Sequence, residues 1–107
     1  NQLYLAGDVR ANEQVGLTVL HTLFVREHNR LADRIATLHP NLNDEEIYQV
    51  ARRIVGAQIQ AITYNEYLPS VLGFELAPRA SDAQYDPTVN ATITNAFAHA
   101  VFRFGHS

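Results

Sequence analysis

The sequence predicts a mainly α-helical fold with three principal helices. Apolar residues recur at helical spacing over roughly residues 17–38, and again over 44–67. A third stretch with the same spacing covers about 88–105. The total of 107 residues is enough for one domain at most.

The first predicted helix combines an apolar side with a charged one. Pro40 follows its expected end. Glu27 and Arg30 are three residues apart, so they can pair on one helix face. His21 and His28 are seven apart, but no further ligands lie at metal-binding spacing, so buried structural hydrogen bonding is the favoured interpretation. The apolar positions are Leu17, Leu20, Phe24, Leu31, Ile35 and Leu38.

The second predicted helix has a clear start and a clear end. Asn43 and Glu46 have the spacing of a capping box. Pro69 is expected to end the helix, because proline lacks an N–H and clashes with the preceding turn. Residues 70–86 are then expected to form a long loop. The expected buried positions are Ile47, Val50, Ala51, Ile54, Gln58, Ile62 and Leu68.

The third predicted helix opens at Asp86 and Pro87. Asp86 can cap a helix, and proline is tolerated at the first helical position. In a continuous helix His99, Arg103 and His106 would lie along one stripe, at positions i, i+4 and i+7. The expected apolar side consists of Ile93, Phe97, Ala100, Val101 and Phe104.

Composition excludes several classes of function. The formal net charge is −3 and no basic stripe is present, which argues against nucleic-acid binding. No apolar run is long enough to span a bilayer, so no membrane segment is expected. The chain has no cysteine, so it contains no disulfide and no thiolate ligand. It begins without methionine and stops soon after a histidine, so we interpret it as a piece of a longer domain.

An arginine and a glutamate just ahead of the first helix are candidates for chemistry. Arg10 is a permanent cation whose planar, forked donors suit carboxylate, peroxidic or phosphate oxygens. Glu13 lies three residues later and can serve simply as its ion-pair partner. Chemistry alone favours that structural interpretation, since most such pairs lie on the surface and contribute little energy.

Three segments of the sequence resemble the animal-type haem peroxidase family. Their sequences resemble bacterial or invertebrate members most. They are Ala6 to Glu13 (Ala-Gly-Asp-Val-Arg-Ala-Asn-Glu), Leu17 to Ala32, which includes Val-Arg-Glu-His-Asn-Arg, and Ala100 to His106 (Ala-Val-Phe-Arg-Phe-Gly-His). The resemblance runs nearly end to end. It implies the helical core of that family. Residues 1–107 would form part of a single catalytic domain, from the distal-arginine segment through the proximal-histidine helix.

The resemblance assigns expected roles to four residues. Arg10 matches the distal catalytic arginine, whose guanidinium would stabilise charge developing on a peroxide oxygen. Glu13 matches a glutamate that can form an ester to a haem methyl group. Arg103 is expected to bind a haem propionate. His106 matches the proximal axial ligand of the haem iron.

The implied function is oxidation of halides or small organic donors by hydrogen peroxide, with haem b as the cofactor. The parent protein is expected to be secreted and to bind calcium outside this chain. The distal histidine also lies outside it, so the isolated segment should be inactive. Two alternatives remain: a fatty-acid dioxygenase of the same superfamily, or a non-catalytic, adhesive helical module. The dioxygenase needs a radical tyrosine just before the proximal histidine, where Phe102 and Phe104 stand and the nearest upstream tyrosine is Tyr85.

Overall fold

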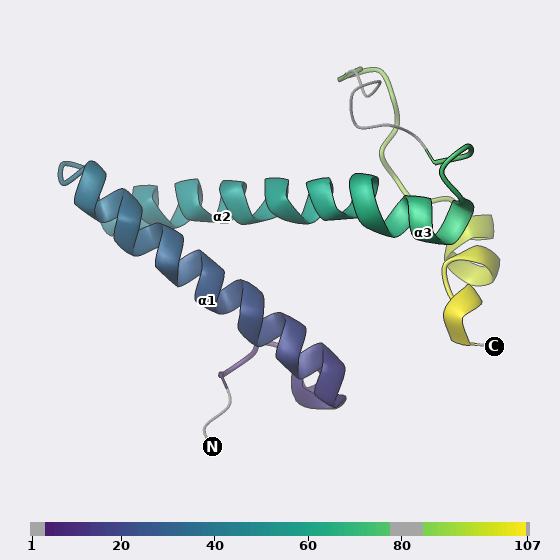
Figure 1. Ribbon diagram of the computed structural model, residues 1–107, viewed down its shortest axis with the longest axis horizontal. Coiled ribbons are helices and arrows are strands. Elements are labelled where there is room, and N and C mark those ends of the chain that lie inside the picture. Colours follow the sequence, from purple (N-terminus) through teal and green to yellow (C-terminus); the bar gives the residue numbers. More distant parts are fainter. Residues whose placement is uncertain (1–3, 78–84, 107) are drawn as a thin grey trace.

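Two long helices joined by a short turn dominate the fold. The computed structural model describes residues 4–77 and 85–106, and every regular element within them is helical. Helix α1 spans Val15–Leu38 and helix α2 spans Asp44–Ile62. The two helices meet near the turn that joins them and diverge away from it (Figure 1). The mainly α fold class is therefore confirmed.

Helix α1 begins two residues before its predicted start and ends at its predicted end, Leu38. The side chain of Gln14 caps the start, accepting a hydrogen bond from the Leu17 N–H at 2.8 Å. At the other end the His39 N–H donates to the Ile35 carbonyl at 2.8 Å. Pro40 follows, as expected past a helix end.

Helix α2 begins with the capping box that its sequence predicts. The Glu46 N–H donates to Asn43 Oδ1 at 3.0 Å, and the Asn43 N–H donates to Glu46 Oε2 at 2.9 Å. Both bonds satisfy N–H groups that the first helical turn leaves unpaired. This start can be predicted because it depends only on residues close in sequence.

The prediction that Pro69 ends the second helix is wrong. Helix α2 continues through one π turn, η2 at Thr63–Tyr67, into helix α3 at Leu68–Leu72. In the π turn the Leu68 N–H donates to the Thr63 carbonyl, five residues back. This wider turn lies just ahead of Pro69, where a regular α turn would press the proline ring against a preceding carbonyl. The helical rod ends at Gly73 instead.

The prediction of a continuous helix over 88–105 is also wrong. Asp86 Oδ1 accepts hydrogen bonds from the Thr88 N–H at 2.8 Å and the Thr88 hydroxyl at 2.7 Å, so it closes a local turn. Asn90 does the same with Thr92, at 3.0 and 2.8 Å. Such side-chain bonds compete with helix formation. Of the predicted loop over 70–86, residues 70–72 are helical and 78–84 lie outside the described residues.

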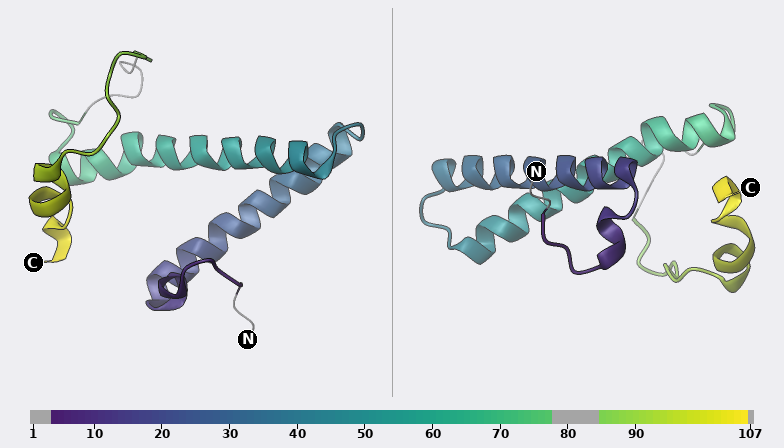
Figure 2. Two further views of the ribbon diagram at one scale, coloured as in Figure 1. Left: turned by 180° about the vertical axis from the view of Figure 1, so that it is seen from behind. Right: turned by 90° about the horizontal axis from the view of Figure 1, so that it is seen from below.

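The helical part of this C-terminal segment is short and irregular. A π turn, η4, spans Phe97–Val101, and a 3-10 turn, η5, spans Phe104–His106. The N–H of Phe97 donates to the Thr94 hydroxyl at 3.3 Å, close to where helical geometry begins. Figure 2 shows this segment as a separate arm beyond the end of α3.

The buried core is small and lies where α1 and α2 are close. Leu31, Ile35 and Ala51 are its buried apolar residues, and they confirm three predicted core positions. Ile54 and Ile62 were also predicted to be buried, but their side chains are 38% and 42% exposed. Within the described residues, no helix is both long and apolar enough to cross a bilayer.

Candidate functional site

A single 3-10 turn, η1 at Val9–Asn12, carries the candidate arginine. Asp8 precedes it and accepts a hydrogen bond from the Arg10 N–H through Oδ1 at 2.9 Å. Two backbone bonds complete the turn, from the Ala11 N–H to the Asp8 carbonyl and from the Glu13 N–H to the Arg10 carbonyl, both at 3.1 Å. The segment that holds Arg10 and Glu13 therefore has a defined local shape.

The ion-pair partner of Arg10 is Asp8. Arg10 Nε donates to Oδ1 at 3.0 Å, and Nη2 donates to Oδ2 at 2.6 Å. These bonds lower the pKa of the Asp8 carboxyl and raise the pKa of the Arg10 guanidinium. The alternative in which Glu13 pairs with Arg10 is therefore wrong, because the tight turn brings residue 8 to the guanidinium. Asp8 was missed as a functional candidate, although an aspartate just before a turn is a recognisable capping signal.

Arg10 and Glu13 both remain accessible to a ligand. The Arg10 side chain is 77% exposed in spite of its ion pair. Glu13 is exposed and, among the described residues, forms no ion pair or side-chain hydrogen bond. Its carboxylate is thus available for another partner. A hollow of about 340 Å³ lies beside Arg10, lined by Asp8, Arg10, Ala11, Leu17 and His21.

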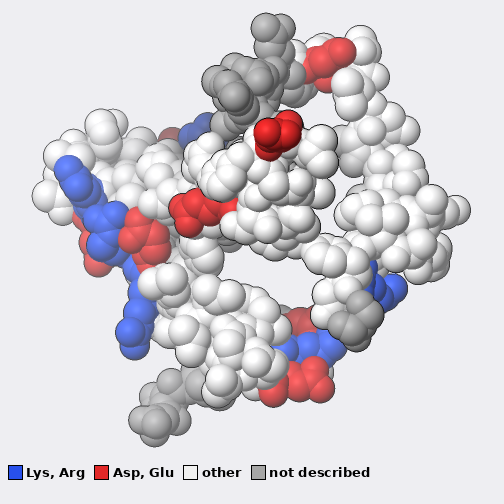
Figure 3. Space-filling model, turned by 45° about the vertical axis from the view of Figure 1, so that its right-hand side comes forward, with Lys and Arg blue, Asp and Glu red and all other residues white. Residues whose placement is uncertain are grey.

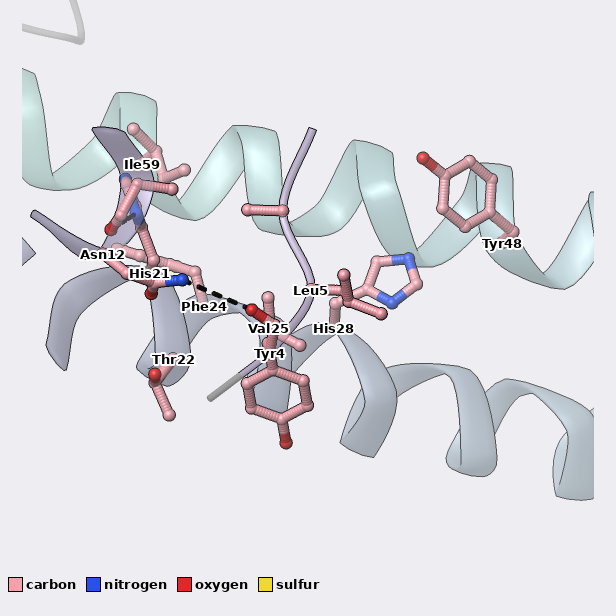
Figure 4. A pocket seen from close by; sticks show the side chains of 12 residues that line it. Tyr4, Leu5, Asn12, His21, Thr22, Phe24, Val25, His28, Tyr48 and Ile59 are labelled. Carbon is pink, nitrogen blue, oxygen red and sulfur yellow. Dashed lines mark hydrogen bonds between the residues drawn. The ribbon is translucent and has the colours of Figure 1, made fainter. Parts of the chain in front are cut away.

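A larger cavity of about 560 Å³ lies next to this hollow, between α1, α2 and the N-terminal segment. Figure 4 shows Phe24, Val25 and His28 of α1 and Tyr48 and Ile59 of α2 around it. The rings of His28 and Tyr48 lie 5.1 Å apart. Arg10, Glu13 and Arg103 do not line this cavity. It is mostly apolar and is a neighbour of the predicted site.

Neither helical histidine fully has the buried structural hydrogen bonding that was expected. His21 forms a hydrogen bond but is exposed, whereas His28 is half-buried, with Nδ1 3.4 Å from Asn29 Oδ1. His21 Nδ1 lies 3.0 Å from the Ala11 carbonyl oxygen. His28 Nε2 is buried and has no hydrogen-bond partner among the described residues. No group of three or more histidine, aspartate or glutamate residues with metal-binding geometry occurs in the described part of the chain.

At the C-terminal end, Arg103 lies against a neighbouring ring. Its guanidinium carbon is 4.4 Å from the centroid of the Phe102 ring, and Nη1 donates to the Ala98 carbonyl at 3.5 Å. The predicted stripe of His99, Arg103 and His106 required one regular helix. A π turn, a turn at residues 102–103 and a 3-10 turn replace it. The side chain of His106 lies outside what the structure describes.

The two ends that carry the candidate residues lie on the same side of α2. In Figure 1 the purple segment that contains η1 and the yellow C-terminal arm both lie below α2. Figure 3 shows openings through this face of the molecule. Arg103 lines neither the hollow beside Arg10 nor the larger cavity between the helices. That the two ends face one shared cavity therefore stays a prediction.

A hydrogen bond from Gln58 of α2 connects the predicted Glu27–Arg30 pair of α1 to α2. Arg30 Nε donates to Glu27 Oε2 at 2.7 Å and Nη2 donates to Oε1 at 2.9 Å, which confirms the pair. Gln58 of α2 also donates to Glu27 Oε1, at 2.9 Å. The bonds from Arg30 and then Gln58 lower the pKa of Glu27 to about 2. Gln58 was expected only as a buried position, and its role depends on how the helices pack.

Comparisons with known proteins agree along the whole chain. The family model described as animal haem peroxidase matches residues 1–107. A peroxidasin homolog of Homo sapiens is 54% identical over 106 residues, covering 97% of this chain and 7% of that protein. Peroxinectin A of Dictyostelium discoideum is 49% identical over 107 residues, covering 100% of this chain and 19% of that protein.

A solved structure gives the same result for the fold. Peroxidase A from Dictyostelium discoideum superposes with a TM-score of 0.85 at 48% sequence identity. The match covers 98% of this chain and 20% of that structure. The chain thus spans a fifth or less of the relatives that it matches here. Sequence and fold agree that the chain belongs to the animal haem peroxidase family.

Proposed function

We propose that this chain is part of the catalytic domain of a haem peroxidase, which uses hydrogen peroxide to oxidise halides or small organic donors. Membership of the animal haem peroxidase family over residues 1–107 is the observation that carries the proposal. The similar solved structure, Peroxidase A from Dictyostelium discoideum at 48% identity, agrees with this proposal. Alternatives within the superfamily lack a comparable observation.

The donor set suits a haem. A haem b presents an iron that needs an axial ligand, two anionic propionates and reactive methyl groups. The chain offers an imidazole at His106, cations at Arg10 and Arg103, and the unpaired carboxylate of Glu13. The openings on the face seen in Figure 3 leave room for a flat group. When bound, the haem supplies the redox chemistry, and the protein controls ligation and access.

We assign each residue a separate task. With haem bound, His106 would ligate the iron and Arg103 would pair with a propionate. Arg10 would stand beside the bound peroxide, where its fixed cation would lower the cost of charge developing on a departing oxygen. Asp8 orients Arg10 through the two bonds described above. A base to accept the peroxide proton, and the calcium site implied by the resemblance, are assigned to the rest of the protein, which we propose is secreted.

Glu13 is proposed to form an ester with a haem methyl group. A Glu13 carboxylate oxygen bonds to the methyl carbon, which loses one hydrogen. The hydrogen would leave as a proton, and this proton, one more from solvent and the two electrons released would reduce one hydrogen peroxide to two water molecules. The carboxylate of Glu13 is exposed and forms no ion pair with any other described residue, which supports this role.

Replacing Glu13 by glutamine in the full-length protein tests the proposal. An amide does not form this ester, so acidified organic solvent should extract nearly all haem from Glu13→Gln after peroxide treatment. The unchanged protein should retain a fraction as a haem-bearing peptide that mass spectrometry detects. Turnover should fall without vanishing, because Arg10 and His106 remain. Glu75→Gln is the matched control, since Glu75 is an exposed glutamate in the turn after α3.

Two results would contradict the proposal at different levels. A full-length protein without a haem absorption band would overturn the peroxidase function. A haem-containing, active protein that releases all its haem after peroxide treatment would overturn only the ester at Glu13.

A further inference from the structure

One hydrogen bond ties the Arg10–Glu13 segment to helix α1. His21 Nδ1 lies 3.0 Å from the carbonyl oxygen of Ala11, which stands between the two candidate residues. A carbonyl can only accept, so Nδ1 carries the proton and donates it. The two groups are ten residues apart and belong to different elements, η1 and the second turn of α1.

The other bonds of the segment do not perform this task. The Asp8 cap and the two backbone bonds at 3.1 Å fix the shape of η1 within itself. The Asp8–Arg10 ion pair moves with η1, because both residues belong to the same turn. Asn12 reaches only the Tyr4 carbonyl of the N-terminal segment, at 3.4 Å. Among the described hydrogen bonds, the one from His21 places η1 on the body of α1.

His21 also separates the two hollows of this region. Together with Ala11, it lines both the hollow beside Arg10 and the larger cavity between the helices. Displacement of the imidazole would therefore change the position of η1 and the wall next to Arg10 together.

We propose that His21 is a positioning residue: its imidazole holds η1 against α1 and thereby sets where Arg10 and Glu13 stand relative to the haem. The proposal rests on the proposed function, because Arg10 and Glu13 need a defined place only if they act on a bound group. A misplacement of about 1 Å can cost on the order of a hundredfold in rate. The four-residue turn η1 has no regular helix of its own to prevent such a shift.

Three variants of the full-length protein separate positioning from simple packing. His21→Leu keeps bulk and removes the donor. His21→Asn places an amide nitrogen near the position of Nδ1 and keeps the donor. His21→Ala is a second donor-free variant, in case leucine prevents folding. His39→Leu is the control, because His39 is an exposed histidine in the turn after α1.

The measurements are made per bound haem. They are the second-order rate constant for reaction with peroxide, followed in the haem absorption band, and the fraction of haem that resists extraction. We expect His21→Leu and His21→Ala to lower both, the rate constant by about tenfold or more. His21→Asn should restore most of the rate constant, and His39→Leu should leave both values unchanged. The KM for the organic donor should stay unchanged throughout.

The result that overturns the inference is also defined. If the donor-free variants react with peroxide as fast as the unchanged protein and link as much haem, His21 does not position the segment. Equal impairment of His21→Asn and His21→Leu would likewise show that ring packing, not the hydrogen bond, matters. A full-length protein that binds no haem overturns the proposed function and this inference together, so the two failures can be told apart.

Discussion

At the scale of single residues, Glu27 joins the two long helices through its carboxylate. Arg30 on the same helix binds both carboxylate oxygens, and Gln58 reaches across from α2. The Glu27 side chain is 23% exposed, so water screens these interactions only in part. The link lies beyond the small core, where the apolar contacts between the helices weaken.

The Glu27 link predicts a pH dependence of stability. Hydrogen bonds from Arg30 and Gln58 lower the pKa of Glu27 from its ordinary 4.5 to about 2. Its contribution is therefore complete above the unfolded value and is lost as the pH falls from about 4.5 towards 2. In the full-length protein, Glu27→Gln should reduce the free energy of unfolding near neutral pH, and the difference should shrink in acid. Urea unfolding across this pH range measures it.

The control for this prediction is Glu75→Gln, which removes an exposed carboxylate far from the link. It should leave the stability curve nearly unchanged over the same range. Parallel curves for Glu27→Gln and the unchanged protein would show that the ionised carboxylate does not stabilise the helix pair.

At the scale of elements, the sequence predicts what depends on near neighbours. The capping box at Asn43 and the end of α1 before Pro40 follow from residues within one turn, and both are confirmed. The continuation past Pro69 depends on a π turn that the apolar pattern does not reveal. The C-terminal helical segment starts late because Asp86 and Asn90 close local turns with their side chains. The apolar pattern does not show whether such residues will form turns or cap a helix.

The helical rod formed by α2, η2 and α3 ends at Gly73, whose backbone conformation can be tested by substitution. Gly73 has a φ of 83° and a ψ of 152°, a conformation almost restricted to glycine. Gly73→Ala should destabilise the full-length protein by about 1–3 kcal/mol, because the backbone is strained even though a Cβ would meet no atom. Urea unfolding midpoints measure the change.

Gly56→Ala is the matched control in the same rod. Gly56 lies within α2, and a Cβ there also has no neighbour within 4 Å. Alanine is the better helix former, so this variant should be neutral or more stable by about 0.5–1 kcal/mol. Equal effects of the two substitutions would mean that the left-handed conformation does not end the rod.

At the scale of the whole molecule, the arrangement is open. The radius of gyration is 17.3 Å, whereas a compact chain of this length is expected at about 13 Å. Large apolar side chains are exposed along it, including Val9 at 95% and Phe74 at 83%. The resemblance was enough to name the candidate residues. It could not predict their relative positions, because these depend on how α1, α2 and the C-terminal arm diverge.

The open arrangement predicts how the isolated 107-residue chain behaves. The small core of Leu31, Ile35 and Ala51 cannot offset the conformational entropy of ordering two long helices. We expect helical circular dichroism and strong binding of a hydrophobic dye, with a gradual loss of signal in urea. Added haem should give no more peroxide turnover than free haem, since the proposed base for the peroxide proton lies elsewhere in the protein. The full-length protein is the control and should unfold cooperatively. A sigmoidal transition of the isolated chain, with a slope of about 1 kcal/mol/M or more, would show that this helical frame folds by itself.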